Sequence, residues 1–201
     1  MTLVERLDRL EAYRQIRELA ARYGSDLDAR DMDGLLELYL PELRDRLRDA
    51  LALPLRRVRI TILYVGTHVI DFSDADNATG SVYCHAEVQN TGANWISQAI
   101  HYGDRYARRD GRWYFARVRH HELFYGADHG VRPNGLPPAD WPDRDTGTGT
   151  VPMRWASWQE FWGTPAPRNA TRRASKGPDS ALPMAVPPPA PVGSPSGPRS
   201  G

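Results

Sequence analysis

Residues 22–33 read Arg22-Tyr23-Gly24-Ser25-Asp26-Leu27-Asp28-Ala29-Arg30-Asp31-Met32-Asp33, and they indicate most directly how this 201-residue chain folds. They predict the end of one amphipathic helix, a short turn and the start of another helix. Asp28 stands where the first helix should end, and a carboxylate there faces the negative end of the helix dipole, which costs up to about 1 kcal/mol. Residues that break a local rule in this way are often functional. Tyr23 adds a second acid–base side chain nearby.

Apolar residues before this stretch recur at three- and four-residue spacings, which predicts one long helix over about residues 3–27. Asp31 is a suitable N-cap for a second helix over residues 32–39. A third, short helix is expected over residues 42–53, ending before Pro54. The apolar stripe of the long helix comprises Leu7, Leu10, Ile16, Leu19, Ala20, Tyr23 and Leu27.

The chain changes character after these helices, because β-branched residues become frequent from Val58 onward. Strands are expected over residues 58–65, 68–72, 78–88, 95–108 and 113–125. Asp110-Gly111, between the last two strands, favours a tight hairpin with positive φ. Helices followed by an antiparallel meander predict an α+β domain.

The C-terminal part of the chain differs in composition. Residues 126–145 are rich in Gly, Pro and Asp and predict a loop. The aromatic segment Trp155–Trp162 predicts a short helix or turn that packs on the domain or on a second subunit. From Thr164 the abundance of Pro, Ser, Gly and Ala predicts a disordered tail. We therefore expect a domain over residues 1–126, an extension over residues 127–163 and a tail over residues 164–201.

Composition excludes several functional classes. The net charge of +1 provides no global electrostatic case for nucleic-acid binding. Cys84 is the only cysteine, which excludes an intrachain disulfide and disfavours a thiolate zinc site. We expect no membrane span and a cytoplasmic protein, because no apolar signal region or long apolar stretch occurs. Neighbours in His120-His121-Glu122 point to opposite strand faces, so we expect no metal. No Gly-rich phosphate loop or dinucleotide fingerprint occurs in the sequence, so we expect no other cofactor.

Several motifs resemble SnoaL-like proteins of the nuclear transport factor 2 (NTF2-like) superfamily. The resemblance covers residues 3–125 and implies a cone, in which a curved antiparallel sheet wraps around a pocket and the N-terminal helices close one side. It implies a homodimer, because a second subunit usually covers the open face of such a sheet. Members of this superfamily usually have a strand or two between the second and third helices, whereas this sequence shows none there, so an edge strand of the sheet is expected to be missing. The motifs are Ile16-Arg17-Glu18-Leu19 with Arg22-Tyr23, Leu27-Asp28, Asp31-Met32-Asp33, Leu38-Tyr39, Gly66-Thr67-His68-Val69-Ile70-Asp71-Phe72, Ala78-Thr79-Gly80 and Tyr102-Gly103-Asp104-Arg105-Tyr106-Ala107-Arg108-Arg109-Asp110-Gly111-Arg112-Trp113-Tyr114-Phe115.

This resemblance implies an acid–base site. In dehydratases of the family a tyrosine, an aspartate and a histidine line the pocket, at positions that match Tyr23, Asp28 and His68. His68 has a suitable unperturbed pKa for a base. Asp28 would orient His68 or stabilise its charged form, and Tyr23 would donate to a developing enolate oxygen.

Further residues are candidates for substrate binding. Glu87 lines the pocket only if its strand face, rather than that of Cys84, points inward. One of His101 and Asp104 faces the pocket unless a bulge intervenes. Arg119 suits a carboxylate or carbonyl group, or a surface salt bridge. The candidates are Tyr64, Glu87, His101, Asp104 and Arg119.

The function expected from the resemblance is that of a cofactor-free lyase or isomerase, of dehydratase or cyclase type. It would act on a hydrophobic hydroxy-carbonyl small molecule by His/Asp/Tyr acid–base catalysis. One alternative is a non-catalytic protein that binds a hydrophobic small molecule. The other is a dimeric interaction module. The family includes polyketide cyclases, scytalone dehydratase and ketosteroid isomerase as well as binding proteins, so the fold alone does not choose.

Overall fold

The computed structural model describes residues 2–131, 139, 143, 146–147 and 149–164. The predicted order of helices and then strands is confirmed. The tail was expected over residues 164–201, of which residues 165–201 lie outside the described residues. No helix in the described ranges is long and apolar enough to cross a membrane. The elements are α1 (Leu3–Ala29), α2 (Met32–Glu37), a 3₁₀ turn (Pro41–Leu43), α3 (Arg44–Leu55), β1 (Val58–Phe72), β2 (Asn77–Asn90), β3 (Asn94–Arg109), β4 (Arg112–Phe115), β5 (His120–Val131) and α4 (Ala156–Gly163).

The strands form one antiparallel sheet in which β3 is central. β1 pairs with β2 and β2 with β3, while β4 and β5 pair with different halves of the other edge of β3. The single strand expected over residues 113–125 is therefore two strands, interrupted after Phe115 and resumed at His120. β5 then continues to Val131, through residues that we expected to form a loop.

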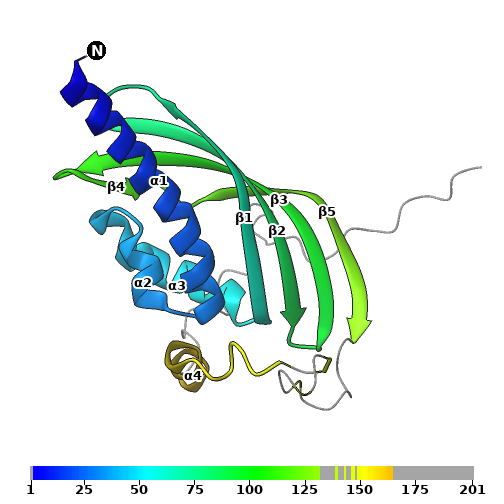
Figure 1. Cartoon of the computed structure of the whole chain (residues 1–201). Helices are drawn as coiled ribbons and strands as arrows, with labels where there is room; N and C mark the ends of the chain where they lie inside the picture. The colour runs from blue at the N-terminus through cyan, green and yellow to red at the C-terminus, as the bar shows by residue number, and fades with distance from the viewer. Residues whose placement is uncertain (1, 132–138, 140–142, 144–145, 148, 165–201) are drawn as a thin grey trace, which may run out of the picture.

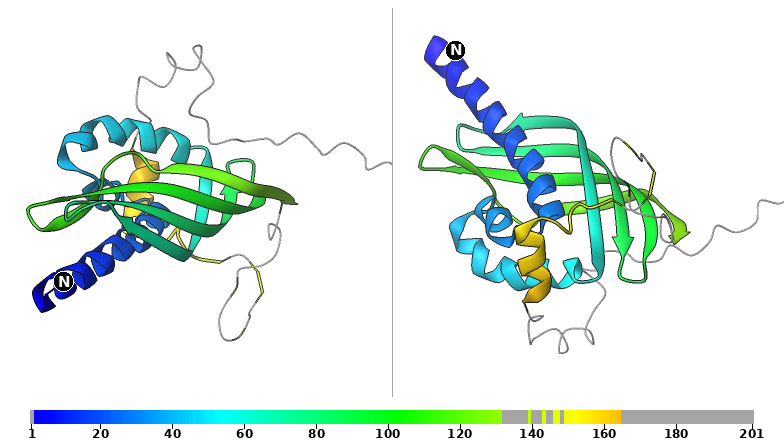
Figure 2. Two further views of the ribbon diagram at one scale, coloured as in Figure 1. Left: turned by 90° about the horizontal axis from the view of Figure 1, so that it is seen from above. Right: turned by 60° about the horizontal axis from the view of Figure 1, so that its bottom comes forward.

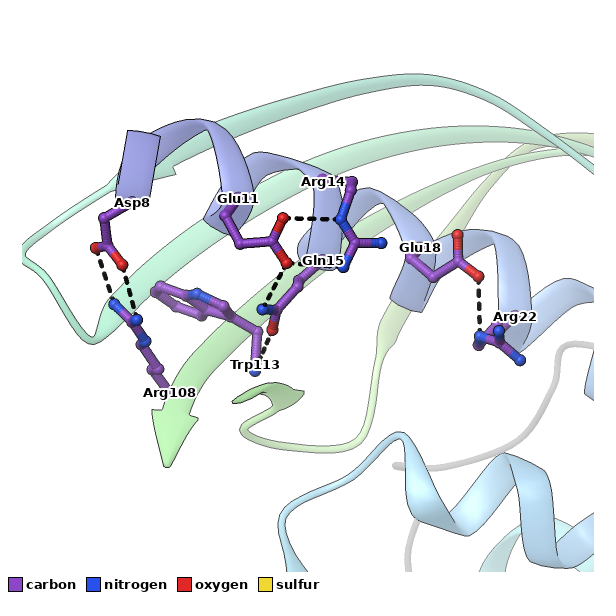
Figure 3. A network of polar contacts seen from close by, with 8 residues as sticks. All are labelled: Asp8, Glu11, Arg14, Gln15, Glu18, Arg22, Arg108 and Trp113. Atoms are coloured by element: carbon purple, nitrogen blue, oxygen red, sulfur yellow. Dashed lines mark hydrogen bonds and ion pairs between the residues drawn. The ribbon is translucent and has the colours of Figure 1, made fainter. Parts of the chain in front are cut away.

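α1 lies across the sheet (Figure 1) and packs mainly against β1. Gly24 permits this approach, because a Cβ there would already lie 3.4 Å from Val65 Cγ2. The other side of α1 is tied to the sheet by polar contacts (Figure 3): Asp8 accepts from Arg108, and Gln15 accepts the Trp113 backbone N–H. The buried residues of α1 are Ala12, Ile16, Leu19, Ala20, Tyr23 and Gly24.

The predicted apolar stripe is confirmed from Ile16 onward and is wrong at its beginning. Leu7 and Leu10 are 57% and 63% exposed. The first turns of α1 extend toward the rim of the sheet (Figure 2), and there the sheet contacts the polar side chains Asp8 and Arg9, through Arg108 and Phe72, and leaves Leu7 and Leu10 exposed. Periodicity alone does not show where a helix leaves the body of a domain.

The segment between α2 and α3 holds a single bridge where relatives of this fold were expected to have a strand. Tyr39 pairs with Phe115 in parallel orientation. The Leu40 N–H donates to the Phe115 carbonyl, and the Phe115 N–H donates to the Leu38 carbonyl. This bridge joins the helices to β4 without adding a full edge strand among the described residues.

The aromatic segment forms α4, which packs on the domain beside the end of α1 (Figure 2). Phe161 is buried, and the Arg56 guanidinium lies 4.5 Å from its ring centroid. The Ser157 hydroxyl donates to the Ala29 carbonyl. The first of the two expected arrangements, packing on the domain surface, is therefore the one observed.

A bulge in β1 determines which of its side chains reach the inner face of the sheet. Val65 pairs with Cys84 and His68 with Val82, so β1 contains one extra residue at Gly66–Thr67. The extra residue switches the inward positions from odd to even numbers. Val65 and His68 consequently both face inward, opposite the buried β2 residues Cys84 and Val82.

Candidate functional site

A chain of hydrogen bonds joins His68, Tyr106, Asp104 and Arg119 on the inner face of the sheet. Arg119 donates to the two Asp104 oxygens at 2.9 and 2.7 Å. The Tyr106 hydroxyl donates to Asp104 Oδ2 at 2.9 Å and lies 3.0 Å from His68 Nε2. β1 supplies the histidine, β3 supplies the tyrosine and aspartate, and the residue before β5 supplies the arginine. We refer to these four residues as the His68 relay.

The inner end of the relay is a fully buried ion pair. The Arg119 and Asp104 side chains are 1% and 0% exposed. Tyr102 and Tyr23 flank the guanidinium, with ring centroids 3.9 and 4.5 Å from its carbon, which adds cation–π attraction. Burial by itself would lower the pKa of Arg119, but the bonds to Asp104 outweigh it and raise that pKa above its ordinary value.

The relay determines which nitrogen of His68 carries the proton. The Tyr106 hydroxyl has one proton and two possible acceptors, the Asp104 carboxylate and His68 Nε2. It donates to the carboxylate, because a charge-assisted hydrogen bond is the stronger of the two. The Tyr106 oxygen then accepts a proton from His68 Nε2–H. His68 Nδ1 keeps its lone pair, and this atom is buried with no hydrogen-bond partner among the described residues.

Electrostatics keep the His68 ring neutral. Burial is the main cause that lowers the pKa of His68 to about 4; Asp104 opposes this effect, and the positive charges of Arg119 and Arg17 add to it. The ring is consequently an unprotonated base throughout the physiological pH range.

Gly80 makes room for the contact between His68 and Tyr106. A Cβ at Gly80 would lie 2.7 Å from Tyr106 Cε2 and 3.1 Å from His68 Nε2. Neither Gly80 nor Tyr106 was among the site residues predicted from the sequence. A glycine inside a strand is a known sign of close approach, so the sequence contains a sign of Gly80 that we did not use. Strand alternation places Tyr106 on the same face as the candidate Asp104, but it does not show that the two residues bond to each other.

Asp28 lies apart from His68, so the structure does not contain the expected Asp28–His68 pair. Asp28 Oδ2 accepts the Leu63 N–H at 3.0 Å. Leu63 and His68 are separated by five residues of extended strand, roughly 16 Å. Burial raises the pKa of Asp28 to about 6, and bonds from the Leu63 N–H and the Thr61 hydroxyl offset part of that rise.

Arg30 explains how the end of α1 is held beside the start of β1. It caps the helix in the left-handed conformation, with φ of 58°. Its buried guanidinium donates to Thr61 Oγ1 at 2.8 Å, to the Val58 carbonyl at 3.0 Å and to the Leu27 carbonyl. These bonds hold the Asp28 carboxylate against β1.

Asp28→Asn is expected to stabilise the protein at pH 8 but not at pH 3. The folded-state pKa of about 6 lies above the unfolded value near 3.8, so the wild-type protein loses stability as the pH rises through 6. A difference of about two pKa units corresponds to at most about 3 kcal/mol. Urea unfolding at both pH values measures the effect, with the exposed Asp71→Asn as control. Equal effects of Asp28→Asn at the two pH values would contradict the assignment.

Three of the candidate binding residues lie on the outer face of the sheet, opposite the His68 relay. Tyr64 is 59% exposed. Glu87 accepts from the Ser97 hydroxyl at 2.8 Å, and His101 Nε2 lies 2.7 Å from Ser81 Oγ. Their strand faces point outward because Cys84 and the other alternate residues of β2 are buried. Asp104 and Arg119 lie on the inner face, as does Tyr23.

A pocket of about 390 Å³ opens between α1 and β1 beside His68. This volume lies in the lower part of the range of roughly 300–1,000 Å³ that holds small molecules. Across the described ranges, no group of three His, Cys, Asp or Glu side chains is arranged to hold a metal ion. The residues that line the pocket are Arg17, Ala21, Val65, Gly66, Thr67 and His68.

Several solved structures share this fold. A hexachlorocyclohexane dehydrochlorinase (LinA) of type 2 is 23% identical with a TM-score of 0.56, over 65% of this chain and 99% of that chain. A protein described as a scytalone dehydratase from Novosphingobium aromaticivorans is 21% identical with a TM-score of 0.54, over 65% and 97%. A protein of unknown function from Mycobacterium tuberculosis is 18% identical with a TM-score of 0.52, over 81% and 90%. No curated protein matches significantly.

A protein-family model matches most of the folded part of the chain. The model described as "SnoaL-like domain" matches residues 8–119. This interval is more than half of the 201 residues and contains the whole His68 relay. The fold and this match agree, and the chain belongs to the family of SnoaL-like domains.

Proposed function

We propose that this protein is a cofactor-free lyase or isomerase that removes a proton next to a carbonyl group of a small, largely hydrophobic molecule. The observation that carries the proposal is the geometry of His68: Nε2 lies 3.0 Å from the Tyr106 hydroxyl, and Nδ1 is buried with no hydrogen-bond partner among the described residues. Two similar structures are named as a dehydrochlorinase and a scytalone dehydratase. Both names denote eliminations, which a base of this kind would serve.

In this proposal His68 is the catalytic base and the rest of the relay positions it. When Nδ1 accepts a proton, the imidazolium is stabilised through Nε2–H, the Tyr106 hydroxyl and the Asp104 carboxylate. Arg119 donates to both Asp104 oxygens, so the carboxylate is held in a fixed position facing the Tyr106 hydroxyl. These dipoles and charges are already in place before the reaction, so they need no reorganisation during it.

Tyr23 and Asp28 have separate proposed roles. Burial raises the pKa of Tyr23, so it stays protonated, and its ring supports Arg119 within the relay. Asp28, with a pKa of about 6, is a proton donor or acceptor for a ligand that extends along β1. Both roles are less direct than that of His68, because neither side chain forms a hydrogen bond to a residue that lines the pocket.

Deuterium exchange at the α-carbon of an enolisable ketone tests this function. With 2-tetralone as the probe in D₂O, ¹H NMR should show exchange that depends on the protein. The rate constant should be level between pH 5 and pH 8 and should fall at lower pH with an apparent pKa near 4, because His68 becomes protonated. A fall near pH 6 would instead assign the proton transfer to Asp28, and no protein-dependent exchange would contradict the proposal.

A second candidate function is non-catalytic binding of a hydrophobic small molecule. The observation that favours it is the low pKa of His68, about 4, because a base so far below neutral pH accepts protons weakly. Ligands that raise the Tm, without exchange or turnover, would select this alternative.

We also propose that a second copy of the chain covers the outer face of the sheet. Tyr83 and Phe124 stack there with ring centroids 5.8 Å apart, and they are 47% and 65% exposed. Tyr64 and Tyr125 extend the same exposed aromatic surface, and exposed apolar patches of this kind mark interfaces. Light scattering should show a dimer that Phe124→Glu converts to a monomer, whereas Leu3→Glu, at another exposed apolar site, should not. A monomeric wild-type protein would contradict this proposal.

A further inference from the structure

The arginines on the exposed side of α1 differ in whether they have a partner. Arg14 forms an ion pair with Glu11 at 2.7 Å, and Arg22 forms one with Glu18 at 2.9 Å (Figure 3). Arg17 lies between them in the sequence, and within the described part of the chain it has no hydrogen bond or ion pair. Its side chain instead borders the pocket beside His68.

The other walls of this pocket differ in chemistry from one side to the other. Ala21 of α1 and Val65 of β1 provide apolar surface. Gly66 and Thr67 form the β1 bulge, where no β2 residue is their register partner. Bulges leave backbone polar groups outside the strand ladder, and Thr67 adds a hydroxyl. The pocket therefore combines one unpaired cation and several polar groups with an apolar surface.

We propose that this pocket binds a small monocarboxylate with an apolar body. The Arg17 guanidinium holds the carboxylate, because its planar fork of N–H donors matches the two oxygens of that group. Ala21 and Val65 contact the apolar body, and the ligand lies against the His68 ring. A single cation matches a single negative charge, which favours a carboxylate over a phosphate.

This assignment narrows the substrate class. If the proposed proton abstraction by His68 holds, the substrate is a hydroxy acid or oxo acid, with its carboxylate on Arg17 and its acidic C–H toward the imidazole. The reaction in that statement rests on the proposed function, whereas carboxylate binding at Arg17 does not.

A titration of the full-length protein with benzoate, followed by ¹H–¹⁵N NMR, tests the proposal. Benzoate should shift the amide signals of Ala21, Gly66 and Thr67. Arg17→Gln should weaken binding about tenfold, the loss expected for one charge-assisted contact. Arg22→Gln is the matched control, since it removes an arginine from the same helix outside the pocket, and it should change the Kd less than about twofold. Benzamide, which has the same shape without the charge, should bind as weakly as benzoate binds to Arg17→Gln.

Each other outcome would overturn the assignment. Benzoate binding that is absent, or unchanged in Arg17→Gln, would show that Arg17 is not the anchor. Equal competition by sulfate would indicate a general anion site rather than a carboxylate site. Ala21→Phe should block the pocket and abolish the shifts, whereas Ser25→Phe, at an exposed position one turn further along α1, should not.

His68→Ala separates this inference from the proposed function. It should lower α-proton exchange by a factor of about 10² to 10⁴. Benzoate binding should still depend on Arg17 in this background, so adding Arg17→Gln to His68→Ala should weaken it about tenfold further. If α-proton exchange depends on His68 but benzoate binds equally well without Arg17, the binding inference fails and the proposed function stands. If benzoate binding depends on Arg17 but α-proton exchange is unchanged without His68, the proposed function fails and the binding site stands.

Discussion

Asp104→Leu is expected to lower the free energy of unfolding by about 3–5 kcal/mol, the usual cost of leaving one member of a buried ion pair without its partner. Asp104 accepts both the Arg119 fork and the Tyr106 hydroxyl, and it is 0% exposed. Without it, the guanidinium would be buried among aromatic rings with no compensating charge. Urea denaturation measures the change, as a lower midpoint at an unchanged slope.

The structure supplies a matched control for this prediction. Asp8 and Arg108 also form an ion pair with two hydrogen bonds, but at the surface (Figure 3), with distances of 2.8 and 2.9 Å and side chains 47% and 24% exposed. Asp8→Ala should lower the urea midpoint far less than Asp104→Leu does, because water screens that pair and solvates the remaining charge. The double variant Asp104→Leu with Arg119→Met should regain most of the stability, since an apolar pair can replace a buried ion pair. If Asp104→Leu costs no more than Asp8→Ala, the buried pair is not the structural centre of the inner face.

His68→Ala is expected to reduce the rate of α-proton exchange by a factor of about 10² to 10⁴, the usual contribution of a positioned general base. Added imidazole should restore part of the rate, which a purely structural role would not allow. His101→Ala is the matched control, because it truncates the same residue type on the outer face of the sheet, and its rate should change less than about threefold.

Two further variants test whether the relay positions His68. Tyr106→Phe removes the hydroxyl that bonds His68 Nε2, and Gly80→Ala places a methyl group 2.7 Å from Tyr106 Cε2. Each should lower the exchange rate about tenfold and shift the pH at which the rate falls, since the contact to Asp104 would be lost. A rate that stays at the wild-type level in both variants would limit the relay to a structural role.

Much of the fold was predictable because it depends on local preferences. Asp31 caps α2 by accepting the Gly34 N–H at 2.9 Å, as its residue type and position indicated. The hairpin at Asp110-Gly111 has positive φ at both residues, 50° and 77°, as that pair favours. Residues within one turn or one hairpin determine both features.

Other parts of the fold depend on contacts that no local pattern records. The break between β4 and β5 aims Arg119 inward to Asp104, fifteen residues away in the sequence. Leu7 and Leu10 fit the apolar period of α1 but remain exposed, because the sheet contacts this part of the helix through Asp8 and Arg9 instead. We expected α3 to end before Pro54, but Pro54 lies inside its last turn and the helix ends at Leu55.

The sequence by itself determined the α+β order, the family and the choice of His68 as the candidate base, because these follow from periodicity, capping and motifs within short segments. Only the tertiary structure decided the partner of that base. One extra residue in the β1 bulge reverses the inward side of the strand and turns His68 toward Tyr106 and Asp104 of β3. Asp28 instead bonds the Leu63 amide. Sequence spacing contains no record of such a register shift, and a shift of one residue exchanges the two faces of a strand.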